Sequence, residues 1–100
     1  MRVDIKNKKT YSGPGVYVGR PSALSNPFKI GRDGTRDEVI AKYAVWLDER
    51  LREDCAAKTA FNDLLETLRL FEEVTLICWC APKRCHAEVI RDKLFEVLND

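Results

Sequence analysis

The chain has 100 residues, of which 45% are hydrophobic and 33% charged, and its formal net charge is +1 at pH 7. This composition is too hydrophobic for a disordered chain and provides apolar residues for one core, so we expect residues 1–100 to form a single domain. No apolar run approaches the roughly 20 residues of a membrane span, and Met1–Lys6 lacks the apolar centre of a signal peptide. We therefore expect a cytoplasmic protein with no membrane partner.

Two features of the chain bear on its partners. Because a domain of this size has a modest core, a second subunit could add stability, and homo-oligomerisation stays open. The small net charge also conceals an uneven distribution, since residues 1–36 carry eight Lys or Arg and two Asp or Glu, whereas residues 37–73 carry five and ten. The basic segment indicates either a small anionic ligand or a solvated basic face beside an acidic helix.

The first third of the chain predicts two strands and a long loop. Arg2–Lys6 alternates polar and apolar residues, which is typical of an edge strand. Val16–Val18 is a short β-prone run that we interpret as a central strand ending at Gly19. Residues 20–34 show neither helical nor strand periodicity, and a loop of this length in a small domain is often functional.

Two helices are predicted next. Thr35 and Glu38 form a capping box, so a helix should begin there and run to about Arg52. A second helix should begin near Thr59. The apolar residues at helical spacing, which we expect to face inward, are Val39, Ile40, Tyr43, Trp46, Leu47 and Leu51, then Phe61, Leu64, Leu65, Leu68 and Phe71.

The last third predicts a strand and a helix. Val74–Cys80 is almost unbroken in its apolar character, which is typical of a strand buried on both faces. A final helix should run from about Cys85 to Leu98, with Val89, Ile90, Leu94, Val97 and Leu98 inward. The order β-β-α-α-β-α predicts an α/β fold with a small mixed or parallel sheet covered by helices. Ligands of such sheets bind beyond the carboxyl ends of the strands, here at Gly19–Lys29 and Cys80–His86.

Three segments carry a resemblance to a known family: Val16–Ser22, Asn26–Gly31 and Cys78–His86. They contain a strand ending in Gly-Arg, an Asn-Pro-Phe loop and a Cys-Trp-Cys-x-Pro-x-x-Cys-His turn. Over about residues 14–95 the chain resembles the bacterial and phage family catalogued as domain of unknown function 4326. The resemblance supplies no activity, but it implies that the three segments belong to one site.

Anion binding is the first hypothesis for this site. A turn followed by a helix presents free backbone N–H groups and the positive end of the helix dipole. The polar and sulfur-bearing residues that we expect to bind or line a ligand there are Arg20, Ser22, Asn26, Lys29, Cys80, Lys83, Arg84, Cys85 and His86. Arg20 would clamp a phosphate or, alternatively, pair with the acidic helix, and Asn26 would orient the ligand. We expect a phosphorylated, nucleotide-like molecule rather than nucleic acid, because no predicted helix carries a basic face.

Two alternatives stay open for the cysteine-rich turn. Cys78, Cys80, Cys85 and His86 are the right number of ligands for a zinc-stabilised interaction module, although the spacing Cys-x-Cys is tighter than usual. A small hydrolase or transferase could instead use Cys85 as the nucleophile, because a helix N-terminus lowers the pKa of a thiol, with His86 as the base. The remaining possibility is structural: Trp79, Tyr17 and Phe28 would then belong to the core or to an interface.

Overall fold

The computed structural model describes residues 1–99 and contains a three-stranded sheet with three helices. The elements are β1 (Arg2–Asn7), β2 (Val16–Tyr17), α1 (Arg36–Arg50), α2 (Ala56–Phe71), β3 (Glu73–Cys78) and α3 (His86–Leu98). The predicted order β-β-α-α-β-α and the α/β class are confirmed. Of the helices in residues 1–99, none combines the length and the apolarity that crossing a membrane requires.

The sheet is parallel throughout and its strand order is β1-β3-β2. In the register, Arg2 lies opposite Glu73 and Val16 lies opposite Leu76. The prediction that Arg2–Lys6 is an edge strand is confirmed, whereas the central position predicted for Val16–Val18 is wrong. β2 is a two-residue edge strand, and the central position belongs to β3, which has partners on both sides.

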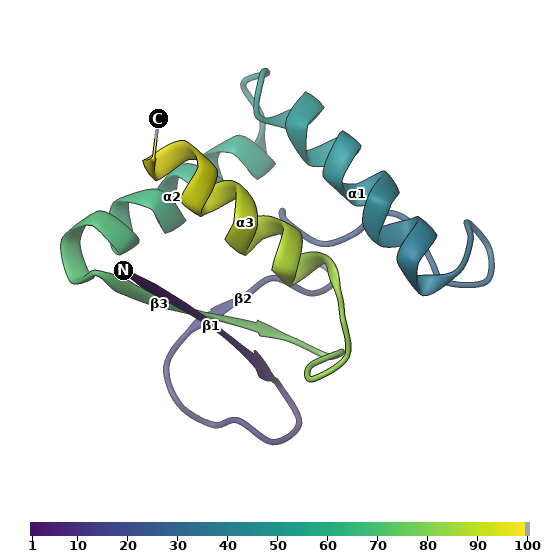
Figure 1. The fold of residues 1–100 in the computed structure, drawn as a ribbon, viewed down its shortest axis with the longest axis horizontal. Helices are drawn as coiled ribbons and strands as arrows, with labels where there is room; N and C mark the ends of the chain where they lie inside the picture. The colour runs from purple at the N-terminus through teal and green to yellow at the C-terminus, as the bar shows by residue number, and fades with distance from the viewer. Residues whose placement is uncertain (100) are drawn as a thin grey trace.

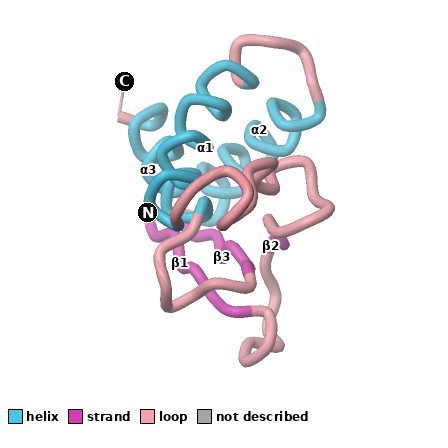
Figure 2. The backbone as a smooth tube through the Cα atoms, turned by 90° about the vertical axis from the view of Figure 1, so that its right-hand side faces the viewer, coloured by secondary structure: helices cyan, strands magenta, loops and turns pink. Residues whose placement is uncertain are grey.

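The prediction that β3 is buried on both faces is also wrong. Val74, Leu76 and Cys78 are buried, but Thr75 and Ile77, which point to the opposite face, are only half-buried. The cause is the layering: all three helices lie on the same side of the sheet, with α2 and α3 against it, and within residues 1–99 the opposite face has no helix (Figure 1, Figure 2). The apolar run of β3 therefore does not indicate helices on both faces of the sheet, since only alternate residues of the strand are buried.

The helices begin and end at recognisable signals. The Thr35 hydroxyl accepts a hydrogen bond from the Glu38 N–H, and the Glu38 carboxylate accepts one from the Thr35 N–H, which confirms the capping box. α2 begins at Ala56, earlier than predicted, and is followed by Glu72 in the left-handed region at φ 61°. The predicted inward position of Phe71 is wrong, because this side chain is 71% exposed at the helix end.

The core lies between the sheet and the helices. Most of the residues predicted to face inward do so, although Trp46, Leu51, Val89, Val97 and Leu98 are only half-buried. The largest fully buried side chain is Tyr43, whose hydroxyl donates to the Leu24 carbonyl over 2.7 Å. This bond ties the long loop after β2 to α1, and so helps to position the loop at the strand ends.

Candidate functional site

A pocket of about 420 Å³ opens where the chain leaves β2 and β3. Because the strands are parallel, their carboxyl ends meet at one edge of the sheet, and the loop after β2 lies beside the turn after β3. The start of α1 forms a third side. The lining residues are Tyr17, Gly19, Arg20, Asn26, Phe28, Lys29, Ile30, Arg36, Val39, Ile40, Trp79, Cys80, Arg84, Cys85 and His86.

The charged residues of this lining all have the same sign. Arg20, Lys29, Arg36 and Arg84 line the pocket, and no Asp or Glu is among the lining residues that the structure describes. Three of these cations were predicted from the sequence, and Arg36 was not. The signal that could have found Arg36 is its position directly after the Thr35 cap, since the capped end of α1 faces the strand ends.

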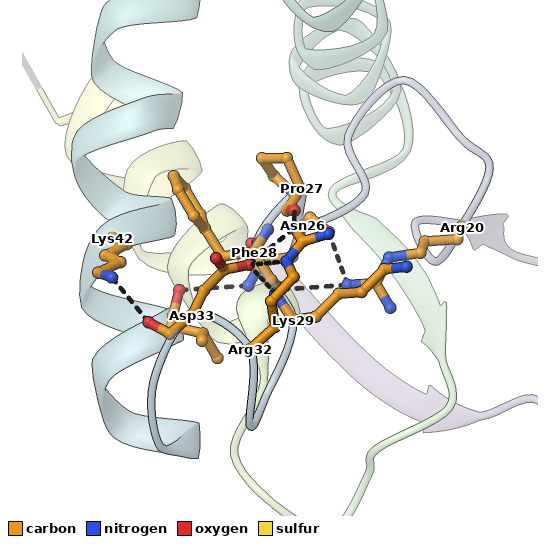
Figure 3. Close-up of polar contacts among 9 residues, drawn as sticks. Arg20, Asn26, Pro27, Phe28, Lys29, Arg32, Asp33 and Lys42 are labelled. Carbon is orange, nitrogen blue, oxygen red and sulfur yellow. Dashed lines mark hydrogen bonds and ion pairs between the residues drawn. The ribbon is translucent and has the colours of Figure 1, made fainter.

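Arg20 is held in place by backbone oxygens. One terminal nitrogen, Nη2, donates to the Asn26 carbonyl over 3.0 Å and to the Phe28 carbonyl over 3.1 Å (Figure 3). The side chain is otherwise exposed, and within residues 1–99 it forms no ion pair. The alternative that Arg20 pairs with the acidic helix is therefore wrong. Its remaining N–H groups are available to a ligand, and the guanidinium is already oriented.

The other cations differ in how they are paired. Arg84 forms ion pairs with Asp37 over 2.9 Å and Glu88 over 3.7 Å. Arg36 donates to the backbone carbonyl of Arg84 over 3.0 Å, and it forms no ion pair with any residue of the described range 1–99. The Lys29 ammonium has no hydrogen-bond or ion-pair partner in the part of the chain that the structure describes. Lys29 is therefore the cation that a ligand could engage at the smallest cost in lost contacts.

Asn26 lines the pocket, but its side chain already serves the fold. Its Oδ1 accepts from the Phe28 N–H over 2.9 Å, and its Nδ2 donates to the Val39 carbonyl over 3.2 Å. The amide thereby joins the loop to α1. The predicted role of Asn26 in orienting a ligand stays a prediction, and bracing the loop is the role that these contacts establish.

The same loop is further fixed around Asp33. The Asp33 carboxylate accepts from Arg32 and from the Lys29 N–H, while the Asp33 carbonyl accepts from Lys42 of α1 over 2.7 Å (Figure 3). The hydrogen bond from Arg32, followed by that from the Lys29 N–H, lowers the pKa of Asp33. These contacts fix the backbone that carries Lys29, so this wall of the pocket is preformed.

Aromatic side chains form the rim. Trp79 is 53% exposed, and its indole N–H donates to the Tyr17 hydroxyl over 2.9 Å. Tyr17 in turn donates to the Arg20 carbonyl over 2.6 Å. Phe28 is half-buried and also lines the pocket, so it is not solely the core residue that the structural interpretation suggested. Trp79 is thus an exposed ring whose orientation is fixed by hydrogen bonds.

His86 is buried at the start of α3. Its Nε2 lies 2.6 Å from the Val18 carbonyl, and its ring meets that of Tyr43 edge-on with the centroids 5.1 Å apart. Burial lowers the pKa of His86 because it disfavours the imidazolium. Nε2 is therefore engaged by a backbone oxygen, and no hydrogen bond joins His86 to the Cys85 thiol within residues 1–99, so the role of His86 as a base stays a prediction.

The thiols of Cys78 and Cys85 contact each other, with their sulfurs 3.4 Å apart. The hydrogen bond from Cys85 lowers the pKa of Cys78 to about 6, against the opposing effect of burial, and the Ala81 and Cys80 N–H groups contribute. The same contact, together with burial, raises the pKa of Cys85. The Ala87 N–H at the start of α3 lowers the pKa of Cys85, as expected of a helix N-terminus, but the contact with Cys78 and burial outweigh it, so the expected net lowering is wrong. No sequence pattern predicted this contact between the two thiols.

The remaining candidates lie apart from this arrangement. Ser22 and Lys83 do not line the pocket, although Cys80 does. The Ser22 hydroxyl oxygen is buried and has no hydrogen-bond partner among the described residues, and Lys83 is exposed on the turn. Within residues 1–99, no three His, Cys, Asp or Glu side chains are grouped closely enough to hold a metal ion, so the four predicted zinc ligands are not gathered into a site.

The comparisons with known proteins identify the family. Residues 3–96 match the model described as Domain of unknown function (DUF4326). No curated protein and no solved structure matches the chain. The matched range includes every lining residue of the pocket. The chain therefore belongs to the family of domains of unknown function DUF4326.

Proposed function

We propose that the protein binds a small phosphorylated, nucleotide-like ligand in the pocket at the strand ends. The observation that carries this proposal is the charge of the lining, in which four cations stand without an acidic residue among the described positions. A concave site with one sign of charge concentrates ligands of the opposite sign. The pocket of about 420 Å³ lies within the usual range for small-molecule sites.

The phosphate would bind between Arg20 and Lys29. Arg20 has donors beyond the Nη2 used by the loop, and an oriented guanidinium can bind two phosphate oxygens at once. Lys29 supplies a charge that no group within residues 1–99 neutralises. The start of α3, with Cys85 and His86 in the lining, adds backbone N–H groups and the positive end of a helix dipole.

The base would stack on Trp79. A large aromatic side chain that is 53% exposed leaves apolar surface in water, and here the hydrogen bond to Tyr17 holds the ring at the rim of the pocket. Stacking of a base on an aromatic ring contributes about 1–3 kcal/mol per base. An aromatic platform beside a cationic pocket favours a ligand that combines a planar ring with a phosphate, and inorganic phosphate satisfies only half of the site.

The free thiols support one further expectation about where this binding takes place. All four cysteines are unpaired in the structure, and free thiols are typical of proteins in reducing compartments. We therefore propose that the protein binds its ligand in the cytoplasm.

Isothermal titration with nucleoside monophosphates tests the proposal. Adenosine, guanosine, cytidine and uridine monophosphates serve as probes, with inorganic phosphate as the reference ligand. At least one nucleotide should bind more tightly than phosphate, and its affinity should fall as salt is added, because surface charge interactions are screened. Absence of binding by every nucleotide at low salt contradicts the proposal.

A matched pair of variants then places the ligand. Lys29→Ala removes a cation that lines the pocket, and Lys83→Ala removes an exposed cation outside it. Charge-assisted hydrogen bonds contribute about 1.5–3 kcal/mol, so Lys29→Ala should weaken nucleotide binding by about tenfold or more. Lys83→Ala should change affinity less than about twofold, because long-range attraction alone is screened. Equal losses in the two variants would show nonspecific attraction to a basic surface.

A further inference from the structure

Cys78 and Cys85 lie at the two ends of the turn that joins β3 to α3. Cys78 is the last residue of β3 and fully buried, and Cys85 is the N-cap residue of α3 and 4% exposed. Their sulfurs are 3.4 Å apart, compared with about 2.05 Å in a disulfide. An approach of roughly 1.3 Å would therefore join them.

Both side chains belong to the hydrophobic core, and their thiols hydrogen-bond to each other. The Cys85 side chain does not cap α3, although it occupies the cap position, and the turn between the two residues contains the pocket-lining Trp79, Cys80 and Arg84. Placing both sulfurs in contact, at a strand end and at a helix start, is the arrangement from which an intrachain disulfide can form without unfolding.

We propose that Cys78 and Cys85 are a site of reversible oxidative modification, at which a hydroperoxide converts the two thiols into a disulfide beneath the ligand pocket. This proposal is independent of the proposed binding function, because it stands on the sulfur contact alone. Cys85 lines the pocket, which gives a molecule as small as hydrogen peroxide a route to the pair.

The chemistry balances with hydrogen peroxide as the oxidant. One sulfur attacks a peroxide oxygen as the thiolate, the O–O bond breaks, and a sulfenic acid and hydroxide result. The second sulfur attacks the sulfenic sulfur, the S–S bond forms, and a second hydroxide leaves. The two thiol protons convert both hydroxides into water, so two thiols and one peroxide yield one disulfide and two waters. The lowered pKa of Cys78, to about 6, provides a thiolate within the pair at neutral pH.

The turn offers a direct assay because trypsin cuts after Lys83 and Arg84, between the two cysteines. The folded protein is treated with hydrogen peroxide at neutral pH, its remaining thiols are blocked with N-ethylmaleimide, and it is digested without reduction. The expected product is residues 70–83 linked to residues 85–91, lighter than the two free peptides by about two hydrogens and separated by dithiothreitol. Circular dichroism of the oxidised protein should be unchanged.

Cys80 lies in the same tryptic peptide as Cys78, so the mass of the linked product does not show which of the two is joined to Cys85. Two variants make this distinction. Cys80→Ser removes the half-buried neighbour and should still form the linked product, whereas Cys85→Ser should not. In urea, where the contact is lost, the linkage in the wild-type chain should form at least about tenfold more slowly, because folding supplies the proximity. Linkage through Cys80 or Cys55, recovery of both thiols unmodified, overoxidation without linkage, or an equal rate in urea would each overturn the proposal.

Discussion

The imidazole Nε2 of His86 lies 2.6 Å from the carbonyl oxygen of Val18, which fastens the start of α3 to the chain just beyond β2. A carbonyl can only accept, so Nε2 carries the proton and the ring is neutral with its other nitrogen as an acceptor. Burial first, and the charge of Arg20 in addition, lower the pKa of His86, and the contact with Val18 opposes them. This buried contact positions both Cys85 and the first turn of α3 beside the pocket.

His86 should make the protein less stable as the pH falls below its ordinary pKa of 6.5. The unfolded chain binds a proton at His86 in this range and the folded chain does not, so the free energy of unfolding decreases by up to about 1.4 kcal/mol for each pH unit between 6.5 and the lowered pKa. Urea unfolding at about pH 7.5 and about pH 5.5 measures the loss.

His86→Gln is the control for this pH dependence. A glutamine amide can donate to the Val18 carbonyl and does not titrate, and His86 is the chain's one histidine. Cys78, whose pKa is lowered to about 6, adds a slope of the same sign above that pH in both proteins, so their difference isolates His86. Identical pH profiles in the two proteins would contradict the assignment.

Gly19→Ala should reduce ligand binding while changing stability little. A Cβ at Gly19 would come within 2.5 Å of the Tyr17 hydroxyl, which joins Trp79 to the backbone of Arg20. Because that hydroxyl is the far end of a side chain that can move, the loss in the free energy of unfolding should stay below about 1 kcal/mol. The displaced Tyr17 would release Trp79, and nucleotide affinity measured by titration should fall about fivefold or more.

Gly13→Ala provides a matched control, since a Cβ there would come within 2.6 Å of the Tyr11 hydroxyl, and neither residue lines the pocket. It should produce a similar change in stability with unchanged affinity. A loss of affinity in this variant equal to that of Gly19→Ala would show that the effect does not pass through the Trp79–Tyr17 contact.

Asn26→Ala should destabilise the fold by about 1–3 kcal/mol, because the Val39 carbonyl and the Phe28 N–H each lose a partner in a partly buried place. Urea unfolding measures this change, and limited proteolysis should show faster cleavage within residues 20–34. Ser25→Ala is the neighbouring control, as the Ser25 side chain makes no hydrogen bond within residues 1–99. Equal stability of the two variants would mean that Asn26 does not brace the loop.

Trp79 should report ligand binding through its fluorescence. The chain has two tryptophans, and Trp46→Phe leaves Trp79 as the single emitter. A base stacked on the indole should quench this emission in proportion to occupancy, with the midpoint at the Kd from titration. Inorganic phosphate should leave the emission nearly unchanged. Nucleotide binding without quenching would place the base elsewhere in the pocket.

Patterns within single segments predicted much of the fold. The capping box at Thr35, the helical stripe through Tyr43 and Leu47, and the apolar run of β3 each depend on neighbours in sequence, and the structure contains all three elements. The errors concern relations between segments. Nothing in Val16–Val18 reveals that β3 takes the central position, because strand order is decided by the whole sheet.

The candidate site shows the same difference between features of single segments and contacts between segments. The charge of Arg20 and Lys29 and their place after a strand were readable from the sequence, and both line the pocket. The contact between Cys78 and Cys85 was not, since it depends on how the turn folds back between β3 and α3. The upward shift of the Cys85 pKa follows from that contact, whereas the helix N-terminus considered alone predicts a downward shift.

The central strand of the sheet is also the last strand along the chain. β1 therefore pairs with residues about seventy positions later, as Arg2 does with Glu73, while α1 and α2 can form from local hydrogen bonds. During synthesis on the ribosome, β1 can pair only after β3 has been made, and the pocket is complete only when His86 contacts Val18. A ligand of this pocket would therefore bind only fully folded molecules. Its binding would protect these molecules from degradation in preference to partly folded chains.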